Sequence, residues 1–164
     1  MVPFEHTRIV VEHELEGAQA WGERHGVLLD WLSDCLQLRV TLIQPVTEAP
    51  YFLRAELKEY RALPPVWTFT DPEWQGTSRP FNFPKGVQAT FGSSMFIIHN
   101  QIAVICAPFN RLAYADQSGP HGDWGGPPNW LNAGSAHIHA EAIGDMLQAI
   151  YRDFSLTRER MVKS

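Results

Sequence analysis

The sequence has few cysteines, no excess of basic residues and no long apolar run. Its two cysteines, Cys35 and Cys106, are too few for a disulfide framework and lack the paired spacing of a structural metal site. We therefore expect a reducing, cytoplasmic setting. Lysine and arginine total 13 against 18 aspartates and glutamates, a formal net charge of -5. No broad cationic face follows from this balance, so nucleic acid is not an expected partner.

Export and membrane insertion are not expected either. No stretch approaches the roughly 20 apolar residues that a membrane-spanning helix needs. Five glutamates interrupt the first thirty residues, where a signal peptide needs an apolar core. What the sequence does contain is 45% hydrophobic residues and six tryptophans in 164 residues, and a chain of this length buries roughly two thirds of its unfolded surface. We expect one globular domain over 1–164, with its core at about 12–154.

Apolar periodicity predicts an N-terminal helix followed by strands. Residues at three- and four-residue steps form the stripe of an amphipathic helix over about 12–33, namely Leu15, Ala18, Gly22, His25, Leu29 and Leu32. Apolar and polar residues then alternate over 38–43 and 51–58. A third extended segment, 66–69, follows the rigid pair Pro64 and Pro65. The period of two predicts strands arranged as a meander.

The second half of the chain is less regular. We expect a long loop over 71–94 and a shaped surface loop over the Gly- and Pro-rich segment 117–128. Between them, 95–106 is expected to be a buried extended segment with a polar turn at 99–101. Ser135 is a candidate cap for a final helix that reaches about residue 154. The aromatic residues, Trp124 among them, are expected to fill the space under the loops. The fold class is therefore α+β.

Cys106 is the strongest candidate for a chemical role. It lies where an apolar run meets Ala-Pro-Phe-Asn, at the mouth between the core and a loop, where a partner can reach its thiol. The alternative is a small buried hydrophobic side chain, which is what most free cysteines are. Cys35 ends the apolar stripe of the first helix and is expected to serve packing.

Three polar residues are candidates to assist a thiol. Asn100 lies six positions before Cys106, and its amide could stabilise the oxyanion of an acyl transfer or could bond its own backbone in a turn. His121 and Asp123 lie in the glycine-rich loop. They could polarise an incoming amine or thiol, or could hold the loop in shape.

A metal site is a further alternative. His137, His139 and Glu141 alternate, and alternate residues of a strand present ligands on one face. On a helix, however, residues two apart point about 200° apart, which removes the ligand geometry. A small metal-dependent hydrolase that uses His121, His137 and His139 is therefore kept only as a third possibility. We expect no metal or other cofactor.

The segment 60–69 resembles a motif of ubiquitin-conjugating enzymes. It reads YRALPPVWTF, close to the YPxxPPxVxF segment of that family. The family has an N-terminal helix, a meander of strands, the proline pair, a His-Pro-Asn element and then the active cysteine in an Ile-Cys pair. This sequence offers the same order, with His99 and Asn100 followed by Ile105 and Cys106. The resemblance covers about 12–154 and implies a ubiquitin-conjugating-enzyme-like domain with long active-site loops and a closing helix.

Departures from that motif indicate a divergent branch. No proline separates His99 from Asn100, and the cysteine is followed by Ala-Pro-Phe-Asn where Leu-Asp is usual. Together, ICAPFNR and GPHGDW are similar to bacterial conjugating enzymes of antiphage defence islands. Those islands pair the enzyme with a ubiquitin-like protein, an activating enzyme and a deconjugating peptidase, or place it beside a cyclic-oligonucleotide synthase of the CBASS type.

The resemblance implies a thioester mechanism. Cys106 would accept the C-terminal acyl group of a ubiquitin-like protein, or of a cyclase-type partner, and pass it to an amine of a target protein. Asn100 or Asn110 would stabilise the oxyanion, and His121 or Asp123 would help deprotonate the amine. The first helix would meet the activating enzyme. The competing interpretation is a catalytically inert interaction module of the same fold.

Overall fold

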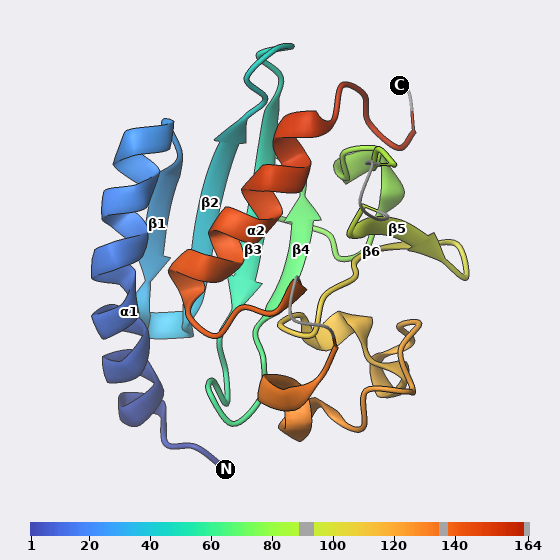
Figure 1. The fold of residues 1–164 in the computed structure, drawn as a ribbon. Coiled ribbons are helices and arrows are strands. Elements are labelled where there is room, and N and C mark those ends of the chain that lie inside the picture. The colour runs from blue at the N-terminus through green and yellow to red at the C-terminus, as the bar shows by residue number, and fades with distance from the viewer. Residues whose placement is uncertain (89–93, 135–137, 163–164) are drawn as a thin grey trace.

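The computed structural model describes residues 1–88, 94–134 and 138–162. It is an α+β structure with a helix at each end of the chain and, between the helices in chain order, a four-stranded antiparallel sheet (Figure 1). The sheet runs in the order β1-β2-β3-β4, a meander, and β5 pairs with β6 in a separate hairpin. The elements are α1 (Phe4–His25), β1 (Leu28–Leu32), β2 (Gln37–Ile43), β3 (Pro50–Glu56), β4 (Val66–Thr70), β5 (Phe96–His99), β6 (Ile102–Ile105) and α2 (Ile143–Leu156).

Helix α1 is shifted relative to the expected span of 12–33. It ends at His25 because Gly26 adopts the left-handed conformation, with φ of 67°, and returns its N–H to the carbonyl of Gly22. The next residues form strand β1, in which Leu28 pairs with Thr41 of β2. The apolar residues that prolonged the helical stripe therefore belong to a strand that the sequence did not reveal.

The three predicted strands are confirmed as β2, β3 and β4. Along β2, buried residues alternate with half-buried or exposed ones, and the register with β3 places Val40 opposite Leu53. The buried side chains of β2, β3 and β4 join those of both helices in one core. This core includes Val11, Leu15, Ala18, Trp21, Leu38, Val40, Leu53, Trp67, Phe69, Ile143, Met146, Ile150 and Phe154.

Helix α2 begins at Ile143, later than expected. The carboxylate of Glu14, on α1, accepts the N–H of Ile143 at 2.9 Å and the hydroxyl of Tyr60 at 2.7 Å. A carboxylate at a helix N-terminus satisfies an unpaired N–H and opposes the helix dipole. The proposed cap, Ser135, lies outside the described residues. Within those residues, neither helix has the length and apolarity needed to cross a membrane.

The hairpin β5–β6 is the buried extended segment with a polar turn that the sequence predicts. Asn100 and Gln101 form its turn, with φ values of 48° and 69°. At its other end Phe96 pairs with Ile105, and the N–H of Cys106 donates to the carbonyl of Met95 at 2.6 Å. The hairpin therefore delivers Cys106 at the end away from its turn.

Candidate active site

Cys106 lies at the start of a loop that is tied to the sheet. The buried side chain of Asn110 donates to the carbonyl of Ile105 at 2.8 Å, and its oxygen accepts the N–H of Trp67, on β4, at 2.9 Å. Asn110 has no exposed surface. Because both ends of this amide are bonded to backbone, it fixes the residue before Cys106 relative to the sheet. The amide faces the fold and not the thiol's surroundings.

The glycine-rich loop folds back on the chain that follows Cys106. The N–H of His121 donates to the carbonyl of Ala113 at 3.0 Å, and the N–H of Ala115 donates to the carbonyl of His121 at 3.0 Å. Gly119 permits this approach, because a methyl group at Gly119 would lie 2.3 Å from the carbonyl oxygen of Leu112. The loop thus places His121 beside Cys106.

Cys106, His121 and Asp123 form a hydrogen-bonded chain. The Nε2 atom of His121 lies 3.0 Å from the Sγ atom of Cys106, and its Nδ1 atom lies 2.9 Å from Oδ1 of Asp123. A carboxylate only accepts hydrogen bonds, so Nδ1 carries the proton and Nε2 is left to accept the thiol proton. Nucleophile, base and orienting carboxylate are the three parts of a catalytic triad.

The electrostatic setting keeps the thiol neutral. Burial raises the pKa of Cys106 to about 11, and the negative charge of Asp123 acts in the same direction. The hydrogen bond from His121 lowers the pKa of Asp123 below its ordinary value, so this carboxyl group is ionised at neutral pH. A nucleophilic attack by Cys106 would therefore require the thiol proton to move to His121, because little thiolate exists beforehand.

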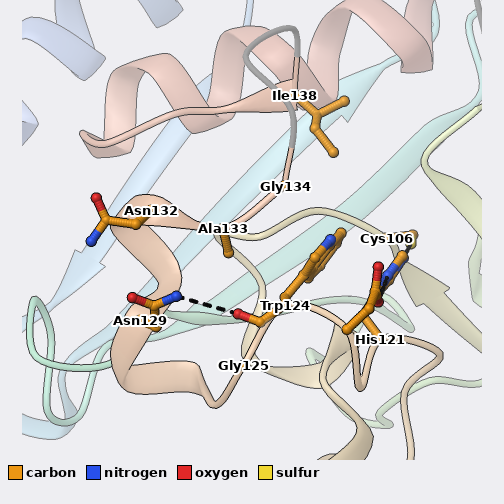
Figure 2. A pocket seen from close by; sticks show the side chains of 10 residues that line it. Cys106, His121, Trp124, Gly125, Asn129, Asn132, Ala133, Gly134 and Ile138 are labelled. Atoms are coloured by element: carbon orange, nitrogen blue, oxygen red, sulfur yellow. Dashed lines mark hydrogen bonds and ion pairs between the residues drawn. The ribbon is translucent and has the colours of Figure 1, made fainter.

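The triad opens into a cavity of about 620 Å³. Cys106 and His121 lie at one end of the cavity, and Asn132 lies at the other (Figure 2). The lining residues are Cys106, His121, Asp123, Trp124, Gly125, Asn129, Asn132, Ala133, Gly134 and Ile138. This space is large enough for the end of a polypeptide chain to reach the sulfur.

The structure brings three of the five expected site residues together. Asn100 lies in the turn of the hairpin, where its amide contacts His99 at 3.3 Å. Cys106 follows the other end, four residues beyond Ile102, which corresponds to roughly 13 Å at 3.3 Å per residue. The expected oxyanion role of Asn100 therefore has no support in its position, and that of Asn110 has none because its amide is bonded elsewhere.

Two other expectations need correction. Cys35 does not serve packing, because it is exposed in a short 3-10 helix after β1. Trp124 is more than filling under a loop, since its ring stacks directly on His121. The signal that could have found this contact is the proximity of His121, Asp123 and Trp124 in one glycine-rich segment.

The residues of the metal alternative are placed differently. His139 contacts the carboxylate of Glu141 at 3.0 Å, whereas His137 lies outside the described residues. In residues 1–88, 94–134 and 138–162, no group of three or more histidine, cysteine, aspartate or glutamate side chains is placed to hold a metal ion.

Comparisons with protein-family models, curated proteins and solved structures found no match.

Proposed function

We propose that this protein is a cysteine-dependent acyltransferase of the ubiquitin-conjugating type. In this proposal an activating enzyme supplies the C-terminal acyl group of a ubiquitin-like protein, or of a cyclase-type partner, to Cys106, and a target amine then receives it. The observation that carries the proposal is the hydrogen-bonded chain from Cys106 through His121 to Asp123, open to a cavity. The antiviral role and the cytoplasmic, reducing setting are proposed from the sequence resemblance alone.

The first step loads the enzyme. The Sγ atom of Cys106 attacks the carbonyl carbon of the donor thioester while its proton passes to Nε2 of His121, 3.0 Å away. A new carbon–sulfur bond forms, the donor's carbon–sulfur bond breaks, and the departing thiolate takes the proton from the imidazolium. Asp123 keeps the proton on Nδ1 of His121 and stabilises the charge that the ring carries in between.

The second step unloads the enzyme onto an amine. Once Cys106 is acylated, Nε2 of His121 is free to accept a proton from the attacking amine. The carbon–nitrogen bond forms and the bond to Sγ of Cys106 breaks, and the imidazolium of His121 gives its proton to the departing sulfur, which restores the thiol. The side chain of Asp123 is 74% exposed beside this site, so its charge also favours the approach of a cationic amine.

Transfer from a thioester fits this site better than hydrolysis of an amide. The N–H of Cys106 donates to Met95, and the N–H of Ala107 donates to the carbonyl of Ile105 at 3.1 Å. These two backbone donors, which lie nearest the nucleophile, are thus not free to form an oxyanion hole. Loss of one such donor costs about 10² to 10³ in rate for difficult acyl transfers. Exchange of one thioester for another of similar energy needs less stabilisation of the oxyanion.

The arrangement of elements also supports the proposal. The N-terminal helix, the antiparallel meander, the cysteine after the last strand and the C-terminal helix follow one another in the order of a ubiquitin-conjugating enzyme. An inert interaction module with the same fold has no use for a base hydrogen-bonded to its cysteine. The hydrogen bond between Cys106 and His121 therefore favours the enzyme over the module.

A loading assay tests the proposal without a known partner. The Cys35→Ser protein is incubated with a peptide whose C-terminal glycine is a thioester, and adducts are located by mass spectrometry. We expect one adduct on Cys106 that a thiol reagent removes. Cys106→Ser should form a slower, thiol-resistant ester, and Cys106→Ala should form none. Absence of the adduct at saturating donor, or loading of Cys106→Ala in this background, would overturn the proposal.

A further inference from the structure

The indole of Trp124 forms a platform under the imidazole of His121. The two ring centroids are 3.5 Å apart and the ring planes are inclined by 2°, so the rings are in van der Waals contact across their faces. Trp124 also lines the cavity beside Cys106 (Figure 2). The stacked face leaves Nε2 of His121 directed at the sulfur and Nδ1 directed at Asp123.

The platform is itself fixed to the loop that carries the nucleophile. Tyr114 packs its edge against Trp124, with ring centroids 5.5 Å apart. Tyr114 is 1% exposed, and its hydroxyl donates to the carbonyl of Pro108 at 2.8 Å. Since Pro108 is two residues after Cys106, the indole, the imidazole and the sulfur are held by one connected set of contacts.

The charges around the imidazole give the stacking a chemical consequence. Among the described residues, the ionisable groups hydrogen-bonded to the ring are the Cys106 thiol and the Asp123 carboxylate, and Tyr114 packs against the indole. The imidazole becomes a cation when it takes the thiol proton. The face of an indole attracts a cation held within about 6 Å of the ring centre.

We propose that Trp124 is a positioning residue that holds His121 in line with Cys106 and stabilises the imidazolium formed during acyl transfer. The inference deepens the proposed function and rests on it for its role in the reaction. Trp124 would have two effects on His121: it would restrict the imidazole and attract its positive charge. An aliphatic side chain could do the first but not the second.

The test compares two substitutions of the platform. Trp124→Leu keeps an apolar side chain and removes the aromatic face, whereas Trp124→Phe keeps an aromatic face. Trp74→Leu is the matched control, because Trp74 packs on Phe52 and Arg39 away from the triad. In each variant the ring-current shift of the His121 protons is followed by NMR, and loading of Cys106 is followed with the glycine-thioester peptide. Circular dichroism reports whether each variant is folded.

We expect Trp124→Leu to lose the ring-current shift of the His121 protons, because the stacked indole face is removed. Loading of Cys106 should fall by about 2-fold to 30-fold. Trp124→Phe should restore most of both properties, and Trp74→Leu should change neither.

An unchanged loading rate in folded Trp124→Leu, or the absence of a ring-current shift on His121 in the unsubstituted protein, would overturn the inference. So would a Trp124→Phe protein that behaves like Trp124→Leu, since the aromatic face would then be irrelevant. If the unsubstituted protein takes no acyl group, the proposed function fails, and the ring-current shift still decides whether Trp124 holds His121 in place.

Discussion

Asp123→Asn should make the Cys106 thiol more acidic and yet a poorer acyl carrier. Burial and the charge of Asp123 both disfavour the thiolate, and they raise the pKa of Cys106 from the ordinary value of 9.0 to about 11. Because the thiolate fraction falls about tenfold per pH unit below the pKa, it is about a hundredfold smaller at neutral pH than that of an ordinary thiol. Removing the carboxylate charge takes away one of the two causes, so the pKa of Cys106 should fall.

The same substitution weakens the base. An asparagine in place of Asp123 no longer holds the proton on Nδ1 of His121 or offsets the charge of the imidazolium. His121→Ala should reduce loading of Cys106 by about 10² to 10⁴. Asp123→Asn should reduce it by less, because this carboxylate is largely exposed and solvent weakens its field.

Alkylation by iodoacetamide in the Cys35→Ser background measures the first effect. When Asp123 is unsubstituted, the alkylation rate of Cys106 should still be rising about tenfold per pH unit near pH 10, because the thiolate is not half formed until about pH 11. For Asp123→Asn the rising part of the curve should lie at lower pH. The peptide-thioester assay measures the second effect, and it should show slower loading of the same variant.

Two results would refute this reasoning. A rate for Cys106 that is already at its plateau near neutral pH would mean that sulfur and imidazole exist as an ion pair before attack. A rising limb that moves to higher pH in Asp123→Asn would mean that the carboxylate favours the thiolate, opposite to the electrostatic sign derived from the structure.

Two further substitutions test how the loops support the site. Asn110→Ala should lower the free energy of unfolding by about 2 to 4 kcal/mol in urea titrations, because it leaves the N–H of Trp67 and the carbonyl of Ile105 unpaired. A loss below about 0.5 kcal/mol would show that water replaces the amide. Gly119→Ala should abolish loading of Cys106, since the added methyl would meet the carbonyl of Leu112 at 2.3 Å, whereas Gly122→Ala should load normally because its methyl meets nothing closer than 3.7 Å. Equal loading by the two alanine variants would contradict the packing argument.

Three of the four strands of the sheet were predictable, because their signals are local. Alternation of apolar residues and the rigid prolines before Val66 each act over a few residues, and β2, β3 and β4 follow them. The end of α1 was misplaced because Leu29 and Leu32 continue a helical spacing. The left-handed Gly26 overrides that spacing, and pairing with β2 then draws the same residues into an extended strand. Periodicity does not distinguish these outcomes, because the decisive contact is with a strand further along the chain.

The site was predictable only as separate residues. Cys106, His121 and Asp123 were each identified, but the contact between the first two joins positions 15 residues apart. It depends on a close approach at Gly119 that has no local pattern. The expected oxyanion role of Asn100 came from its closeness to Cys106 in the sequence and from the order of the motif in a similar family. The hairpin moves that asparagine away from the sulfur, so a shared order of residues did not imply a shared geometry.

The two cysteines differ in the feature that the proposed mechanism needs. The Sγ atom of Cys35 is exposed, and its hydrogen bond, at 3.7 Å, is to the carbonyl oxygen of Leu32. A backbone carbonyl accepts a hydrogen bond but does not take the proton. Cys106 is more buried and less acidic than an ordinary cysteine, yet its partner is the imidazole of His121, which takes a proton readily. Accessibility alone would select Cys35, whereas the need to move a proton during attack selects Cys106.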